Sequence, residues 1–230
     1  MPTVVIGNNE EENAIAERGK AEMASNFTKA IGGGFHGEWE TKDQGTPYLT
    51  LVAAQSALVE ELDGCKPGML VFDKEFILNK PLSLTVLDLQ KDWTQIMTDP
   101  NDSSMPKRWS TEAQAQAEGF RQGRRSDGGK VYGPSATGRL LIEVPADAGL
   151  LNYEGKHYAQ ALFGFKGSSW GLASKILKAC LRIEKPPHNV SWQMDSEKIT
   201  NNNNSWWVPK LANLGEHKQE FVDFVVKEAL

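Results

Sequence analysis

The sequence has few features that indicate secretion or membrane insertion. Its 230 residues include only two cysteines, Cys65 and Cys180, which lie far apart and form no CxxC pair. Secreted domains of small size usually carry more cysteines at closer spacing, so we expect two reduced thiols. The chain opens with no basic segment followed by an apolar stretch, and no run approaches 18 apolar residues. We therefore expect a cytoplasmic protein with no membrane partner.

Motifs of common catalytic and cofactor sites are also scarce. We identify no GxxxxGK[ST] phosphate loop, no GxGxxG at a strand-to-helix turn, no HExxH and no nucleophile elbow. None of the four histidines stands three or four residues from another, whereas zinc sites favour such close pairs. The sequence therefore predicts no cofactor, no metal site and no catalytic residue.

Charge is distributed unevenly along the chain, whose net charge is −5. Residues 105–189 carry 13 basic and 7 acidic side chains, whereas residues 1–65 carry 4 basic and 11 acidic ones. A concentration of cations favours polyanionic partners, so the basic middle of the chain indicates nucleic acid. Charges on a solvated surface also cluster by chance, and that interpretation stays open.

Short apolar runs predict strands. Leu82, Leu84 and Val86 alternate with polar residues in a pattern that continues to Trp93, which is typical of a half-buried strand. Further strands are expected over 69–72, 140–144, 157–165, 190–199 and 205–208. Turn residues at 152–155 and 201–204 predict hairpins, because asparagine and glycine tolerate left-handed backbone angles.

Helices are expected over 112–122, 169–183 and 216–230, where apolar residues recur at helical spacing or a capping residue comes first. Together these elements predict an α+β protein, either a β-rich OB-like barrel or a curved antiparallel sheet decorated with helices. We expect three parts: an acidic, partly flexible N-terminal arm (1–45) with a helix over 14–31, a β-rich core (46–215), and an amphipathic C-terminal helix (216–230). Exposed Phe221 and Phe224 on that last helix would allow a homo-oligomer.

Basic and aromatic residues are adjacent at several places. Single-strand binders need both, because cations contact phosphates and flat rings stack on bases. Trp206 and Trp207 are neighbours on a predicted strand and must point to opposite faces, so we expect one of them to be exposed, and Trp109 as well. For Trp93, Trp170 and Trp192 we favour the core. The predicted nucleic-acid contacts are Lys107, Arg108, Trp109, Arg121, Arg124, Arg125, Lys130, Tyr132, Lys175, Lys178, Arg182, Trp206, Trp207 and Lys210.

Several short motifs follow one another in a particular order: TPYLTLVAAQS at 46–56, CKPGM at 65–69, KDW at 91–93, FKGSS at 165–169 and SWWVP at 205–209. This series resembles a family of bacteriophage early proteins placed near phage single-stranded DNA-binding proteins with an OB-like core. The resemblance covers residues 46–210 and implies an accessory role in replication or recombination. Many phage single-strand binders end in an acidic tail, whereas this chain ends in an amphipathic helix that contains Lys227.

The leading hypothesis is therefore a phage protein that binds single-stranded DNA and is not an enzyme. Two alternatives stay open. One is a structural or host-directed interaction factor that docks a partner through its terminal helix. The other is a metal-dependent nuclease that uses scattered carboxylates.

Overall fold

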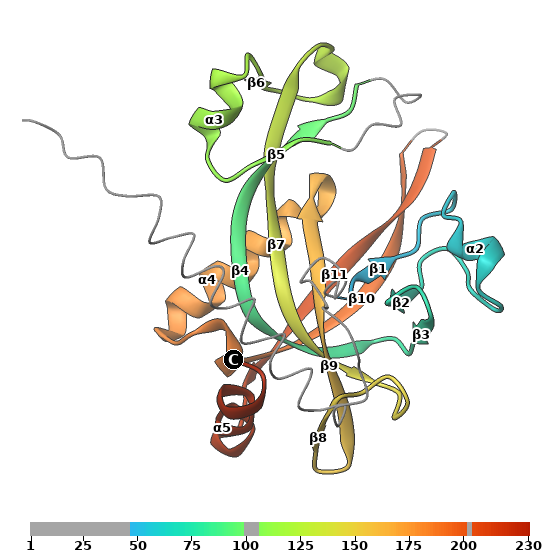
Figure 1. Cartoon of the computed structure of the whole chain (residues 1–230), viewed down its shortest axis with the longest axis vertical. Helices are drawn as coiled ribbons and strands as arrows, with labels where there is room; N and C mark the ends of the chain where they lie inside the picture. The colour runs from blue at the N-terminus through green and yellow to red at the C-terminus, as the bar shows by residue number, and fades with distance from the viewer. Residues whose placement is uncertain (1–46, 99–105, 202–203) are drawn as a thin grey trace, which may run out of the picture. The chain divides into compact units, whose positions relative to one another are not determined.

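The computed structural model describes residues 47–98, 106–201 and 204–230. The predicted arm at 1–45, including its helix over 14–31, lies outside these ranges. Residues 47–230 form one compact unit whose largest element is an antiparallel sheet (Figure 1).

The larger sheet has the strand order β11-β10-β4-β7-β9-β8. In chain order its main strands are β4 (Leu82–Ile96), β7 (Val131–Val144), β8 (Leu151–Tyr153), β9 (Lys156–Lys166), β10 (Val190–Asn201) and β11 (Asn204–Glu216). Two short strands extend it: β5 (Arg108–Trp109) pairs with β4, and β6 (Arg121–Gln122) pairs with β7. A smaller sheet consists of β1 (Leu49–Leu51), β2 (Leu70–Phe72) and β3 (Phe76–Leu78).

Four α-helices and three single turns of 3₁₀ helix accompany the described strands. The α-helices are α2 (Leu58–Glu61), α3 (Glu112–Ala117), α4 (Trp170–Ile183) and α5 (Gln219–Glu228). The 3₁₀ turns are η1 (Arg125–Asp127), η2 (Gly167–Ser169) and η3 (Pro187–Asn189). Helix α3 begins with a capping box, in which the Thr111 side chain accepts a hydrogen bond from the Gln114 backbone N–H.

The predicted α+β class is confirmed in its coarser form, a β-rich antiparallel sheet with helices. Strands β4 and β7 bend along their length (Figure 1). Among the described strands no pairing joins β11 to β8, so the larger sheet does not close into a barrel. The OB-like arrangement therefore stays a prediction.

Most predicted elements occur where the sequence places them, with differences at their ends. The β10–β11 hairpin turns at 201–204 as predicted. The hairpin expected over 138–165 contains an insertion, because the turn at 153–156 joins β9 to β8 and not to β7. Helix α3 ends at Ala117, not near 122, because Gly119 takes a left-handed conformation and Arg121–Gln122 then pair with β7.

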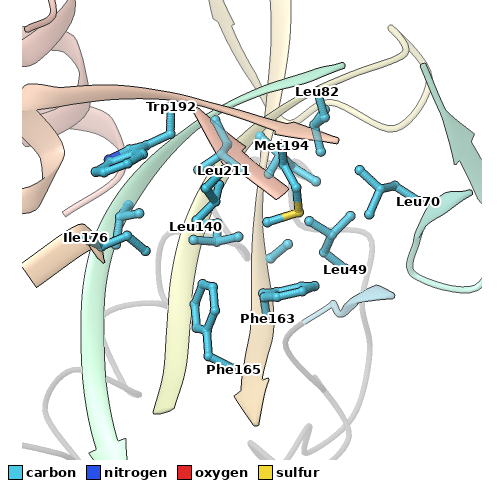
Figure 2. Close-up of a cluster of buried hydrophobic side chains, with 14 of the residues drawn as sticks. Leu49, Leu70, Leu82, Leu140, Phe163, Phe165, Ile176, Trp192, Met194 and Leu211 are labelled. Atoms are coloured by element: carbon cyan, nitrogen blue, oxygen red, sulfur yellow. The ribbon is translucent and has the colours of Figure 1, made fainter. Parts of the chain in front are cut away.

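The main hydrophobic core lies between one face of the larger sheet, helix α4 and the smaller sheet (Figure 2). Trp192, Met194 and Leu140 contribute from the larger sheet and are fully buried. Helix α4 contributes Ala173, Ile176 and Cys180, the apolar stripe expected from its sequence. Trp192 is thus in the core as predicted, and Cys65 and Cys180 are buried free thiols.

Helix α5 packs on the opposite face of the sheet. Phe221 is only 9% exposed, and its ring centroid lies 5.2 Å from that of Tyr153 and 5.7 Å from that of Tyr158. Phe224 is half-buried, 5.0 Å from Tyr153. The expected exposure of these phenylalanines is therefore wrong, because the apolar face of the helix covers the protein's own sheet. Self-association of the protein stays a prediction, but the phenylalanines of α5 no longer support it.

His217 anchors the start of helix α5 to the sheet. Its Nε2 lies 2.8 Å from Oγ1 of the buried Thr85, and its ring lies 4.4 Å from that of Phe221. Burial lowers the pKa of His217 from 6.5 to about 4. The folded protein therefore holds this imidazole neutral at pH values where the unfolded chain binds a proton.

We predict that this anchor makes folding stability depend on pH. Between pH 6.5 and 4 the unfolded chain takes up a proton at His217 that the folded protein does not, so stability falls as the pH falls. Urea unfolding at pH 7 and pH 5 should show that the native protein loses about 1–2 kcal/mol more than His217→Gln over this interval. Equal losses in the two proteins would contradict this role for His217.

Candidate nucleic-acid interface

The basic segment 121–130 is a structured loop and not a random one. β6 runs parallel to β7, and the Gly123 N–H donates to the Tyr132 carbonyl at 3.1 Å. Asp127 Oδ2 accepts a hydrogen bond from the Arg124 N–H at 2.7 Å, and Arg121 Nη2 donates to the Asp127 carbonyl at 3.1 Å. Arg121, Arg124, Arg125 and Lys130 remain exposed to solvent on this framework.

Two of the predicted base-stacking residues are buried. Trp109 is 6% exposed and packs against Phe120, with ring centroids 4.8 Å apart, while its Nε1–H donates to Glu118 Oε1 at 2.8 Å. Tyr132 is 1% exposed and donates its hydroxyl proton to Glu112 at 2.8 Å. Helix α3 folds over both rings, so neither can stack on a base. The prediction of stacking by Trp109 and Tyr132 is therefore wrong.

Besides Arg121, four of the predicted phosphate contacts have partners within the chain. Lys107 forms an ion pair with Glu118 at 2.6 Å, Arg108 with Asp92 at 3.3 Å and Lys210 with Glu197 at 2.5 Å. Lys175 Nζ donates to the Leu211 carbonyl and thereby fastens helix α4 to β11. Exposed ion pairs are worth at most about 1 kcal/mol, so a phosphate can compete for Lys107 or Lys210. Lys175 is the more firmly held of the four, because it joins two packed elements.

Helix α4 carries the other predicted cations on its outer side. Lys178 and Arg182 are exposed, and neither forms an ion pair with another described residue. Leu177 and Leu181 are exposed beside them. With a rise of about 1.5 Å per residue, Lys178 lies about 12 Å and Arg182 about 18 Å along the helix from Trp170.

The β10–β11 hairpin places its two adjacent tryptophans on opposite faces, as expected. Trp206 is exposed (39%). Trp207 is half-buried and packs against Gly68, which lies in the turn before β2 of the smaller sheet. Lys80 Nζ lies 5.6 Å from the centroid of the Trp207 ring and donates to the Gly68 carbonyl at 2.8 Å. Trp206 is therefore the solvent-facing ring of the pair.

A hollow of about 570 Å³ lies where one edge of β7 changes its partner. β7 pairs with β4 from Val131 to Ile142. On its other edge it pairs with β9 from Ser135 onward and with β6 only at Val131 and Tyr132. Among the described strands, none therefore pairs with Gly133 and Pro134 on that edge, and both residues line the hollow.

The lining of this hollow is cationic and partly apolar. Arg124 and Arg125 come from the basic loop, Lys166 from the end of β9 and Trp170 from the first turn of α4. The remaining lining residues are Thr94, Gln95, Ile96, Met97, Pro106, Gly123, Gly133, Pro134, Ser135 and Gly167. None of the lining residues is acidic, and among the described residues the three cations form no ion pair.

The structure thus unites only part of the predicted site. Arg124 and Arg125 lie at the hollow, whereas Lys178, Arg182 and the β10–β11 tryptophans do not line it. Lys166 and Trp170 were not among the predicted contacts, and Trp170 was expected in the core. It is half-buried and contacts the main core while it lines the hollow. The spacing of four residues between Lys166 and Trp170, across a predicted strand-to-helix turn, was the only sign in the sequence that the two residues could share a site.

Contrary to the expectation from the sequence, Gly167–Gly171 matches the pattern GxSxG at a strand-to-helix turn. In a nucleophile elbow the serine is strained and exposed. Here Ser169 is buried, has an ordinary φ of −89°, and uses its Oγ to accept from the Lys166 N–H and donate to the Lys166 carbonyl, both at 2.9 Å. The hydroxyl therefore fixes the turn between β9 and α4.

Comparisons with known proteins return no matching family model, no matching curated protein and no matching solved structure. The resemblance to a phage family therefore stays a prediction. Within the part of the chain that the structure describes, no three or more His, Cys, Asp or Glu side chains gather where they could hold a metal ion. In the same part, no helix is long and apolar enough to cross a membrane.

We predict that Gly68 is required for the contact between the smaller sheet and the β10–β11 hairpin. Gly68 has a φ of +88°, and an added Cβ would lie 2.5 Å from the Trp207 ring. Gly68→Ala should lower the free energy of unfolding by about 1–3 kcal/mol, because a rigid ring must move and the backbone is strained. Urea unfolding measures this, with Gly164→Ala as the control, because a Cβ at Gly164 meets nothing within 4 Å. Equal stability of the two variants would refute the contact's importance.

Proposed function

We propose that this protein binds single-stranded DNA at the hollow between β9 and β6. The observation that carries the proposal is its lining: Arg124, Arg125 and Lys166 line the hollow together with half-buried Trp170, and none of the lining residues carries a carboxylate. A cationic groove and an accessible aromatic ring are the two features that sequence-tolerant single-strand binders share.

The overall charge of −5 does not oppose this proposal, because screening limits exposed charges to interactions within about 8–10 Å. What matters is the charge near the hollow. Exposed Arg121 and Lys130 lie on the same loop as Arg124 and Arg125. Lys107 directly precedes β5, and its carbonyl accepts a hydrogen bond from the N–H of Gln95, which lines the hollow. Asp127, the acidic residue of that loop, is occupied by the Arg124 N–H.

An OB-like arrangement belongs to the same proposal. Tyr48, the residue before β1, forms a bridge with Leu162 of β9, and the Gly68 carbonyl accepts a hydrogen bond from Ser196 Oγ of β10 at 2.6 Å. In the strand order of the larger sheet, β9 and β10 lie on either side of the central β4–β7 pair. The smaller sheet and the turn before β2 thus contact strands on both sides of this pair. This supports a barrel-like core that the smaller sheet completes by packing and not by continuous pairing.

The two alternatives stay predictions. The protein-interaction hypothesis expects exposed phenylalanines on α5 that dock a partner, but Phe221 is buried against the protein's own sheet. A nuclease would need its metal ligands to come at least in part from residues outside the described ranges, or from fewer than three His, Cys, Asp or Glu side chains. Neither alternative explains the cationic lining of the hollow.

Titration with oligo-dT at several salt concentrations tests the proposed function. The native protein should bind, and its affinity should fall steeply as salt rises, because cations released from the strand drive the association. Arg124→Ala/Arg125→Ala should weaken binding about 10-fold or more and reduce the slope of log K against log [salt] by about 1.4, the value for two lost phosphate contacts on a single strand.

Lys66→Ala/Lys74→Ala is the matched control, because both lysines are exposed and lie on the turns before and after β2, outside the lining of the hollow. This control should keep the native affinity and slope. Failure of the native protein to bind oligo-dT at low salt and micromolar concentration would refute the proposed function.

A further inference from the structure

We infer that the hollow is a subsite for one unpaired nucleotide, in which Trp170 stacks on the base while Lys166 and the Arg124–Arg125 pair hold the flanking phosphates. This inference rests on the proposed function and adds the residue that reads the base. It also names the substrate class, an unpaired nucleotide within a strand.

The size and lining of the hollow fit a ligand of this kind. Its volume of about 570 Å³ lies within the range of about 300–1,000 Å³ that is usual for small-molecule pockets. Ile96, Met97 and Pro134 supply apolar surface for a base. Neither β6 nor β9 pairs with Gly133 and Pro134, and proline has no N–H, so of the Pro134 backbone groups only the carbonyl can meet a polar atom at the rim of the base.

The wall that carries Trp170 is rigid. The Ser169 hydroxyl closes a turn on the Lys166 backbone with two hydrogen bonds of 2.9 Å, which fixes Lys166 and Trp170 relative to each other. Gly167 has a φ of +56°, a conformation that few other residues adopt easily. Trp170 contacts the main core and also lines the hollow, so stacking needs little reordering of the ring.

The opposite wall is also held in place. A Cβ on Gly123 would lie 2.7 Å from Asp127 Oδ2 and 2.9 Å from Val131 Cγ1, which shows how closely the loop packs where it leaves β6. Asp127 then fixes the Arg124 backbone. Cations that come from two separate elements and line one hollow together with an indole suit a flat group with a negative charge on either side, which describes a nucleotide in a strand.

The same geometry favours single strands over duplexes. In a duplex each base is stacked and paired, so its flat face is not available to Trp170 without unstacking, which costs a few kcal/mol. Duplex DNA can still meet the cations at the rim. We therefore expect Trp170 to contribute to binding of single strands and not to the weaker binding of duplexes.

Substitution of Trp170 separates this inference from the proposed function. A base that stacks on Trp170 should quench the tryptophan fluorescence of the native protein. Trp170→Leu should weaken binding to oligo-dT about 10-fold or more and remove most of this quenching, while duplex binding and the salt dependence stay as in the native protein. Trp170→Phe should restore most of the affinity, because phenylalanine keeps a stacking face. Ser169→Ala, which removes only the positioning hydroxyl, should weaken oligo-dT binding to an intermediate extent.

The matched control is Trp206→Leu, which removes the exposed indole of the β10–β11 hairpin. It should leave affinity and quenching unchanged. If Trp206→Leu and not Trp170→Leu lowers affinity and quenching, the subsite is wrong but single-strand binding stands. If the native protein binds dTMP as tightly as oligo-dT, the hollow takes a free nucleotide and the proposed place within a strand is wrong. Thermal unfolding of each variant confirms that it is folded.

Discussion

The pairing of β7 with β4 is the constraint from which the rest of the described structure follows. These strands pair from Val131 to Ile142. Together with β9 and β10 they supply most of the buried residues of the main core on one face, and helix α5 packs on the other face. On its second edge, β7 pairs with β9 up to Ser135, opposite Lys166, and with β6 at Val131 and Tyr132. The two residues between these segments have neither partner. The break in pairing is therefore built into the sheet, and it opens where the chain turns from β9 into α4.

This origin explains why the candidate site is rigid. Its floor is sheet, one wall is the first turn of a helix that packs on the core, and the other wall is a loop tied to β7. A site on packed elements holds its side chains more accurately than a free loop does. A loop held only by solvent would not need Asp127 to fix Arg124 or Gly123 to pack against Val131.

Burial also decides which aromatic residues can meet a ligand. Trp109 and Tyr132 form a small core with Ala115 and Phe120 beneath helix α3, and each of their polar atoms has a carboxylate partner. Burial of each large ring stabilises this part of the fold by about 1.5–3 kcal/mol, which binding would have to overcome. Trp206 is exposed and Trp170 is half-buried, and of these two only Trp170 lines the hollow with cations that form no ion pair among the described residues.

The sequence predicts the elements better than the site. Alternation at Leu82–Trp93, the Thr111 cap and the asparagine turn at 201–204 are local signals, and each predicts its element. Adjacent basic and aromatic residues are local as well, but exposure depends on what packs from elsewhere: α3 covers Trp109, and β8 with α5 covers Phe221. The hollow itself arises where β9 and β6 end beside β7, a register between distant segments that no short pattern contains.

Ultraviolet cross-linking of the native protein to oligo-dT, followed by tryptic digestion and mass spectrometry, tests the central claim most directly. The account predicts cross-linked peptides that contain residues 167–175, with Trp170 as the modified residue. Cross-links confined to Trp206 or to the distal half of helix α4 would contradict it.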